Sequence, residues 1–293
     1  MANNISKFKQ YVVGLLDEVY KAASKTSVLD GNPELASQGA NADELIIPKI
    51  DMDGLADYDR ASGYTSGDVT FTNETVKCNF DRGRMFTVDN VDNMDTAGMA
   101  FGRLSGEFIR TKVVPELDAF RLAKYAGISG ADVTAAASAY ADGEAVRKAI
   151  ATKYDAMTDA EVPEEGRYLF IVPTYAGMLR DMDTTKSREL LGKFAGIQEI
   201  PQSRFYSAIT QNDGKTSGQT AGGYKKATAG KNMNFMIIQK DAVIQYPKHI
   251  APKVVTPEQN QDADAWKFGY RNVGIADAYV NKAAGIAGEY GAN

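Results

Sequence analysis

The chain has 293 residues, 44% of them hydrophobic and 24% charged, with a formal net charge of −5. This composition is typical of a globular protein large enough to form two lobes or one elongated body, and the acidic balance argues against a dedicated nucleic-acid binder. The single cysteine excludes an intrachain disulfide and a cysteine metal cluster, and the sequence shows neither an apolar run long enough to span a membrane nor the apolar core of a signal peptide.

The N-terminal region predicts an amphipathic helix over residues 5–24, followed by a polar linker over Ser24–Asn41. The apolar positions of this helix are Ile5, Phe8, Val12, Leu15, Leu16, Val19 and Tyr20. A helix on such a linker cannot bury its apolar stripe alone, so it folds back on its own body or docks on a neighbouring subunit. The sequence does not separate these arrangements from an ordinary N-terminal helix.

A long hairpin is expected next. Glu44–Ile50 reads as a strand, and Pro48 favours a sheet edge because proline has no N–H to donate to a neighbouring strand. Asp68–Phe80 reads as a second strand, and a bulge is expected across Thr72–Thr75, where the apolar residues change parity. The segment between the strands, Asp51–Asp68, is polar and rich in glycine. Such an arm has little core of its own and needs a partner surface.

The segment after the hairpin carries turn and carboxylate signals. Asp81-Arg82-Gly83 predicts a turn, and Met85–Val88 predicts a short strand. Asp89, Asp92 and Asp95 are close enough in sequence to suggest a cation site. Solvated carboxylates at a turn and a helix start are the favoured interpretation of these three residues.

The stretch Met94–Gly127 predicts one long helix that acts as a spine. Asp95 is the expected N-cap, and Gly127 is expected to end the helix in the left-handed conformation. At about 1.5 Å per residue the helix would be roughly 46 Å long. Pro115 removes one backbone hydrogen bond inside it, so a kink is expected near Thr111–Pro115. Periodicity alone favours an ordinary buried helix of an α/β enzyme.

The rest of the chain predicts strands mixed with helices, which suggests a central sheet covered by helices. Helices are expected over Glu144–Met157 and Tyr175–Met182, and strands over Arg167–Val172, Ile197–Ile200, Phe235–Gln239, Val254–Val255, Trp266–Tyr270 and Val273–Val280. Gln211–Lys231 is rich in glycine, threonine and lysine and predicts a mobile loop.

No catalytic, cofactor-binding or metal-ligating residues are predicted. Gly214-Lys215-Thr216 resembles the end of a phosphate-binding loop, but the first glycine of that motif would fall at Ile209. His249 is the only histidine, so a metal cluster built on histidines is excluded. An enzyme that works with a pair of carboxylates stays open at this point.

Seven stretches, taken in order, carry a resemblance that covers most of the chain. They are Gly54–Arg60, Gly63–Tyr64, Asp81–Phe86, Val114–Arg121, Ile200–Phe205, Asn234–Ile238 and Tyr246–His249. As an ordered set they resemble the major capsid proteins of tailed bacteriophages, which have the HK97-like fold. The resemblance therefore implies an α+β protein with an N-terminal arm, an extended loop, a peripheral domain with a long spine helix, and an axial domain.

The resemblance also implies how the chain is divided. The implied parts are an N-terminal arm (1–43), the extended-loop hairpin with its base (44–92), the spine helix of the peripheral domain (93–130), the axial domain (131–252) and the C-terminal strands of the peripheral domain (253–293). It further places the loop Gln211–Lys231 in the axial domain, near the axis of the capsomer.

The implied function is that of a shell protein and not of an enzyme. Many copies form hexamers and pentamers, which close an icosahedral head around double-stranded DNA that the acidic chain contacts weakly. The implied partners are other copies, a portal protein and a separate scaffolding protein, since only about 43 residues precede the first hairpin strand. No membrane or cofactor is expected. The implied location is the virion, after assembly in the cytoplasm of a bacterial host.

The candidates for contacts between subunits are Asp57, Tyr58, Arg60, Tyr64, Arg82, Arg84, Glu116 and Asp118. Arg82 and Arg84 are expected to donate charge-assisted hydrogen bonds to carboxylates. Because Asp51–Asp68 contains no lysine, a shell without isopeptide crosslinks is expected. The alternatives are an encapsulin-type compartment and a two-lobed carboxylate-dependent hydrolase or sugar-binding protein.

Overall fold

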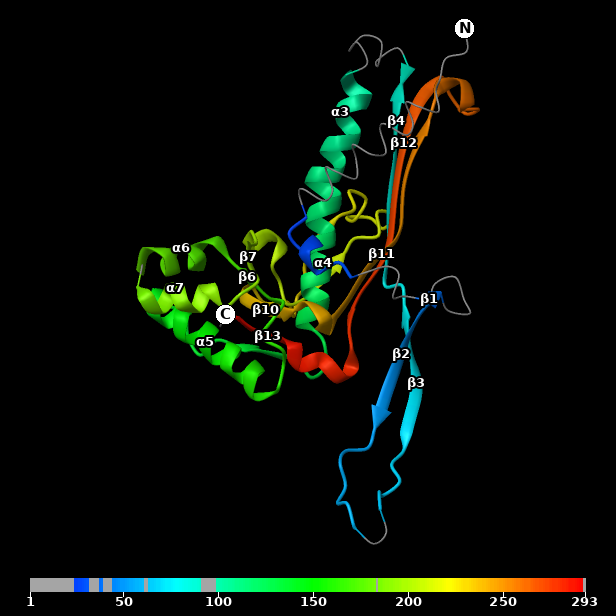
Figure 1. Cartoon of the computed structure of the whole chain (residues 1–293). Helices are drawn as coiled ribbons and strands as arrows, with labels where there is room; N and C mark the ends of the chain where they lie inside the picture. The colour runs from blue at the N-terminus through cyan, green and yellow to red at the C-terminus, as the bar shows by residue number, and fades with distance from the viewer. Residues whose placement is uncertain are drawn as a thin grey trace.

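The computed structural model describes residues 24–31, 37–38, 44–60, 63–90, 99–182 and 184–291. The predicted N-terminal helix, apart from Ser24, and the carboxylates Asp92 and Asp95 lie outside these ranges. The molecule consists of a lobe of helices on a sheet, a long helix flanked by a long sheet, and a hairpin that projects away from both (Figure 1).

The lobe is built on a five-stranded sheet with β10 at its centre. The strand order is β5 (Asp132–Ala135), β13 (Ile286–Tyr290), β10 (Met233–Gln239), β6 (Arg167–Ile171) and β7 (Gly196–Glu199). Every residue of β10 is buried. The helices α5 (Gly143–Asp159), α6 (Pro173–Met182) and α7 (Thr185–Gly192) pack on one face of this sheet. The predicted apolar face of α5 is confirmed, because Val146, Ile150, Tyr154 and Met157 are all buried.

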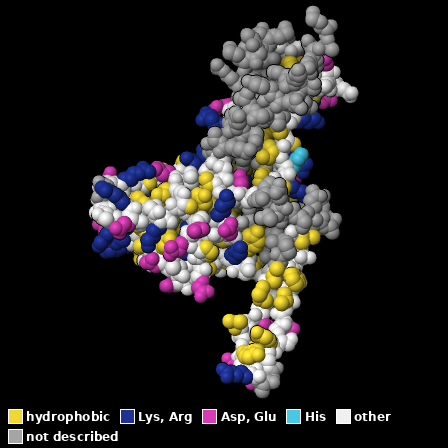
Figure 2. Space-filling model, viewed as in Figure 1, with side chains coloured by type: hydrophobic (Ala, Val, Ile, Leu, Met, Phe, Trp, Pro, Cys, Tyr) yellow, Lys and Arg dark blue, Asp and Glu magenta, His cyan; other side chains and the backbone are white. Residues whose placement is uncertain are grey.

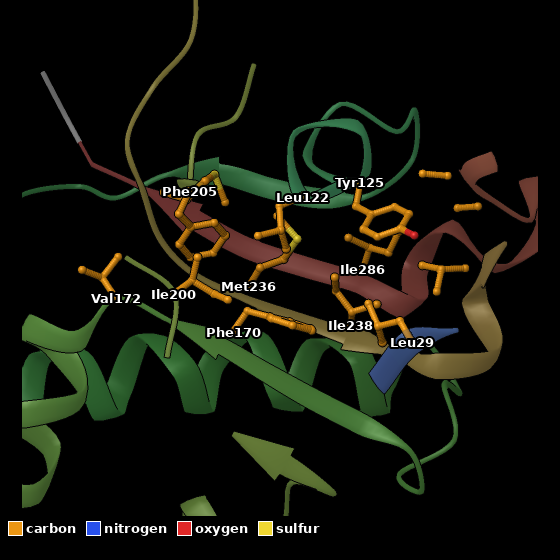
Figure 3. Packing of buried hydrophobic residues seen from close by; sticks show 14 residues of the cluster. Leu29, Leu122, Tyr125, Phe170, Val172, Ile200, Phe205, Met236, Ile238 and Ile286 are labelled. Atoms are coloured by element: carbon orange, nitrogen blue, oxygen red, sulfur yellow. The ribbon is translucent and has the colours of Figure 1, made fainter. Parts of the chain in front are cut away.

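The other face of the sheet packs against the C-terminal part of the spine helix. Leu122 and Tyr125 of α4 (Val114–Ala126) meet Phe170 of β6 and Met236 of β10 in one cluster (Figure 3). Leu29 belongs to the same cluster, so the segment before the hairpin is held in this core as well.

The spine is helical over the described residues 99–126, but its hydrogen-bonding pattern changes in the middle. The helix α3 (Met99–Phe108) continues through a π-helical segment, Ile109–Val113, into α4. Pro115 provides the reason, because it has no N–H for the carbonyl of Thr111. At the place where a kink is expected, the structure shows a change of helix type. The predicted left-handed end is wrong: Gly127 ends the helix with φ of −94°.

A three-stranded antiparallel sheet lies along the spine, in the order β11 (Val243–Val255), β12 (Ala265–Ala278) and β4 (Phe80–Asp89). Phe80, Phe268 and Tyr270 pack against Ile109 and Val114 of the spine. The two late strands predicted over 266–280 are thus one strand, and the predicted strand over 85–88 is part of β4.

The predicted turn at residues 81–83 is wrong, because it lies inside β4. Gly83 is paired with Arg271 of β12. A Cβ atom at this position would lie 2.9 Å from the carbonyl oxygen of Tyr270. Glycine is therefore required here for the close approach of two strands and not for a turn.

The hairpin consists of β2 (Glu44–Met52) and β3 (Val69–Lys77), with the short β1 (Ser37–Gln38) on the outer side of β2. The predicted bulge is wrong, because the two long strands pair without a register shift from Glu44–Lys77 to Met52–Val69. The parity change has another cause: Val76 faces the body at the hairpin base, whereas Phe71 faces solvent.

The remaining elements are short. The strands β8 (Ile209–Gln211) and β9 (Tyr224–Lys226) form a two-stranded ribbon, and 3-10 turns lie at Ser27–Leu29, Gln202–Arg204, Lys240–Ala242, Pro257–Gln259 and Val280–Gly285. The implied domain limits differ from the sheets at two places. The strand β11 crosses residue 252 without a break, and β13 joins the lobe sheet and not the sheet along the spine.

Candidate assembly surfaces

The projecting hairpin exposes an apolar face. Ile50 is paired with Phe71, and Met52 is paired with Val69, so these four side chains share one side of the ribbon. Their exposed fractions are 53%, 73%, 66% and 57% respectively. Figure 2 shows hydrophobic side chains along the part of the hairpin that extends from the body. A group of exposed apolar side chains on an extended arm is typical of an interaction surface. Single apolar residues scattered over a surface are, in contrast, normal.

The described residues at the tip of the hairpin, 53–60 and 63–68, contact one another. The backbone N–H of Asp68 donates to the carboxylate of Asp53 at 2.8 Å, and the rings of Tyr58 and Tyr64 lie 4.8 Å apart. Leu55 is completely exposed. The contact candidates Asp57, Tyr58, Arg60 and Tyr64 all lie on this tip and are exposed. The described residues of the tip therefore contact one another and leave a surface open to a partner.

A charge pair joins Arg82 of β4 to Glu116 of the spine helix. The Nε of Arg82 donates to Oε1 of Glu116 at 2.8 Å, and its Nη2 donates to the carbonyl oxygen of Asn212 at 2.7 Å. The side chains of Arg82 and Glu116 are only 26% and 13% exposed. The predicted carboxylate contact of Arg82 is confirmed within the chain. For Arg84 no carboxylate partner is found among the described residues, and its Nη1 donates to the carbonyl oxygen of Thr220 at 3.1 Å.

The loop over residues 211–231, predicted as a mobile loop, folds onto these two arginines. It contains β9, which pairs with β8. Gly214 and Gly222 both have positive φ, and Cβ atoms there would lie 3.2 and 3.3 Å from Nη1 of Arg84. These glycines let the loop wrap closely around the guanidinium. Burial raises the pKa of Tyr224 to about 12, so this side chain is neutral at physiological pH.

Asp118 is completely buried, which corrects its assignment as a contact between subunits. Its carboxylate accepts hydrogen bonds from Ser24 Oγ at 2.8 Å, from the backbone N–H of Lys25 at 3.1 Å, and from both the N–H and the hydroxyl of Thr26. Arg204 adds a positive charge at 3.6 Å. The residue therefore fastens the segment that precedes the hairpin to the spine of its own chain.

A second set of hydrogen bonds completes this anchor. Gln245 on β11 donates to the carbonyl of Thr26 and to the carboxylate of Asp30, both at 2.7 Å. It also accepts the hydroxyl of Tyr125 at 2.8 Å. Arg121 lies 3.4 Å from Asp30, so a charge pair closes the network. The segment over residues 24–30 is thus tied to both the spine and the sheet beside it.

The described part of the chain offers little that suits catalysis. Among those residues no group of three or more histidine, cysteine, aspartate or glutamate side chains could hold a metal ion. His249 is exposed on β11. Burial and the hydrogen bond to Glu289 raise the pKa of the Tyr140 phenol. No helix in the described ranges is long and apolar enough to cross a membrane.

No protein-family model and no curated protein matches the sequence. The structure matches the capsid of Myoviridae Phage XM1 with a TM-score of 0.55 and 12% identity, over 91% of this chain and 90% of that chain. It also matches a structure from Mycobacterium phage Che8 with a TM-score of 0.59 and 15% identity, over 92% and 90%.

A third match is the virus-like particle from Pyrococcus furiosus, with a TM-score of 0.54 and 10% identity over 92% of this chain and 97% of that chain. At such low identities these matches establish the fold. The chain has the α+β HK97-like capsid fold that the sequence resemblance implied.

Proposed function

We propose that this chain is the major capsid protein of a tailed bacteriophage. Many copies form hexamers and pentamers of an icosahedral shell around double-stranded DNA. The protein is then located in the virion, after assembly in the cytoplasm of its bacterial host. The observation that carries the proposal is the exposed apolar face of the projecting hairpin, in a chain with the HK97-like fold. The described residues of the chain leave this face uncovered.

In this proposal the hairpin laps over a second copy of the chain. Ile50, Met52, Val69 and Phe71 become buried there, and full burial of such a side chain stabilises the contact by about 1.5–3 kcal/mol. The tip residues Asp57, Tyr58, Arg60 and Tyr64 form the polar rim of the same contact. Burial of the apolar face supplies most of the free energy, because exposed charge pairs contribute little.

The other implied partners follow from the same proposal. A separate scaffolding protein directs the size of the shell, and a portal protein occupies one opening. Packaged DNA is contacted weakly, because a chain with a net charge of −5 cannot neutralise many phosphates. The chain performs no catalysis of its own.

A shell without covalent crosslinks is also proposed. The loop Asp51–Asp68 contains no lysine to attack an amide on a neighbour. Of the two late asparagines, Asn272 is 2% exposed and out of reach of another subunit, whereas Asn281 is exposed, so the proposal rests on the missing lysine. Particles boiled in detergent should release one band near 31.7 kDa, and a ladder of covalent multimers would contradict the proposal.

An encapsulin-type compartment is the second candidate, because the same fold occurs in a virus-like particle from Pyrococcus furiosus and not only in phage capsids. The fold gives no support to the third alternative, a two-lobed hydrolase or sugar-binding protein. Electron microscopy of the purified protein, alone and with its scaffolding partner, tests the proposal. Closed shells that need the scaffolding partner support a phage capsid, and closed shells that the chain forms alone around a cargo protein support a compartment. A compact monomer at all concentrations contradicts both.

A further inference from the structure

The chain changes sheets between β3 and β4, and the structure shows how this junction is made. The strand β4 begins at Phe80, which is paired with Gly274 of β12. If β4 extended further toward the N-terminus in the same register, residue 78 would lie opposite Ala276 and pair with it. The chain does not continue along β12 there: β3 ends at Lys77, and it belongs to the hairpin.

The side chain of Asn79 takes the place of the missing strand. Its Nδ2 donates to the carbonyl oxygen of Ala276 at 2.7 Å, and its Oδ1 accepts the N–H of Ala276 at 3.1 Å. A carboxamide has the donor and acceptor of a peptide group, so it satisfies both backbone groups of Ala276 as a neighbouring strand would. The hydrogen-bond ladder is thereby closed at the point where the main chain turns away.

We propose that Asn79 is a positioning residue for assembly. Its two hydrogen bonds fix the direction in which the hairpin leaves the body, and they hold the arm ready to dock on a second copy. The inference rests on the proposed shell function, because a set direction matters only if the arm has a target. Only chains whose arm points in the docking direction can bind a second copy. An arm that is already oriented keeps this fraction of chains high, whereas a freely moving arm would lower it.

The contacts beside this junction explain why Asn79 should affect the direction of the hairpin more than the stability of the fold. Below the junction, Val76 packs with Ile244 and Ile275 in a small cluster separate from the main cores. This apolar contact holds the base of the hairpin to the body but has no directional preference. The paired hydrogen bonds at Ala276 do have one, since they require near-linear geometry. Loss of the carboxamide therefore leaves the arm attached and frees it to swing.

The first experiment measures the arm in the unassembled full-length protein. Spin labels are placed on exposed positions of the hairpin and of α5, Thr72→Cys and Asp155→Cys, in a Cys78→Ser background. With Asn79 present, the distance distribution between the labels should be narrow. Asn79→Ala should broaden it and shift its mean, while the melting temperature and the amide protection of β10 remain near those of the parent.

Two further variants separate the proposal from a general effect of substitution. Asn79→Asp keeps an acceptor for the N–H of Ala276 but places a carboxylate oxygen against its carbonyl, so the distribution should again broaden. Asn281→Ala removes an exposed asparagine elsewhere on the surface and should leave the distribution narrow. An unchanged narrow distribution in both Asn79 variants would overturn the proposal.

The second experiment measures assembly with the same proteins. If the unsubstituted chain forms shells, Asn79→Ala should raise its threshold concentration roughly tenfold, because fewer arms are oriented for docking at any moment. An unchanged threshold together with a broadened distribution would overturn the assembly role of Asn79. A chain that forms no shells under any condition would instead contradict the proposed function, while the label distances would still report on the junction.

Discussion

Two strand regions of this molecule, β10 in the lobe and the β2–β3 hairpin, carry apolar side chains in opposite environments. All seven residues of β10 are buried, because strands flank it on both edges and helices cover both faces of its sheet. In the hairpin, Ile50, Met52, Val69 and Phe71 lie in solvent. The lobe thus completes its own core, whereas the arm carries surface that only a partner can bury. Stability of the subunit and assembly of the shell should therefore respond to different substitutions.

The largest effect should come from two matched substitutions of phenylalanine. Phe235→Ala on β10 leaves a cavity in a core that is fully enclosed, and it should lower the free energy of unfolding by about 3–5 kcal/mol. Phe71→Ala on the hairpin should change it by less than about 0.5 kcal/mol, because the ring is 73% exposed. Chemical denaturation of the subunit measures both values.

In an assembly assay the two substitutions should rank in the opposite order, with the larger effect at Phe71. Phe71→Ala removes apolar area from the proposed contact, so the threshold concentration for shells should rise by roughly tenfold or more. Light scattering against concentration, carried out below the denaturation midpoint of each variant, measures this. If Phe71→Ala destabilises the isolated subunit and leaves the threshold unchanged, the contrast between lobe and arm is wrong.

The next largest effect concerns the anchor between these two regions. Asp118→Asn preserves the shape of the side chain but turns one acceptor into a donor that faces other donors. The free energy of unfolding should fall by about 3 kcal/mol, since a buried carboxylate with several hydrogen bonds is lost. Hydrogen exchange should show the greatest loss of protection over residues 24–30.

Asp155→Asn is the matched control for the anchor, because Asp155 is exposed on α5. It should leave both the unfolding free energy and the protection of residues 24–30 unchanged. An equal loss of stability in the two variants would show that Asp118 has no special role in fastening the segment before the hairpin.

A smaller effect is expected at the charge pair of Arg82 and Glu116. A double-mutant cycle of Arg82→Leu and Glu116→Gln should give a coupling energy of about 1 kcal/mol, because the pair is largely but not fully buried. The exposed pair of Arg271 and Asp81 in the same sheet is the control, with expected coupling under about 0.5 kcal/mol. Equal couplings would mean that burial does not distinguish the two pairs. If Arg82→Leu also leaves assembly intact, Arg82 contributes only within its own subunit.

The features that sequence predicts well here are those set by local periodicity. The apolar spacing of Val146, Ile150, Tyr154 and Met157 gives the buried face of α5 directly. Pro115 likewise gives the irregularity of the spine, because its missing N–H acts within one turn. The fold class follows from the resemblance of the ordered stretches and not from any single pattern.

The features that sequence misses depend on distant partners. Asp118 resembles a surface carboxylate until Ser24, 94 residues away, is placed beside it. Gly83 signals a turn until the carbonyl of Tyr270 is seen to require the space. The apolar face of the hairpin was also missed, because it appears only when the register pairs Ile50 with Phe71. The alternating apolar residues on the two strands were its available signal.

The smallest expected effect concerns Asp213, at the exposed end of the loop that wraps the arginines of β4. Hydrogen bonds from the hydroxyl of Thr216 and from the N–H groups of Lys215 and Thr216 lower the pKa of Asp213 from 3.8 to about 2. Because the folded-state pKa is depressed, the contribution of this carboxylate is fully present above pH 3.8 and is lost as the pH falls through 2. NMR of the Lys215 and Thr216 amides should therefore show a transition near pH 2, which Asp213→Asn abolishes. A transition near the ordinary value of 3.8 would mean that these hydrogen bonds are not formed in solution and that the turn at Asp213 is open.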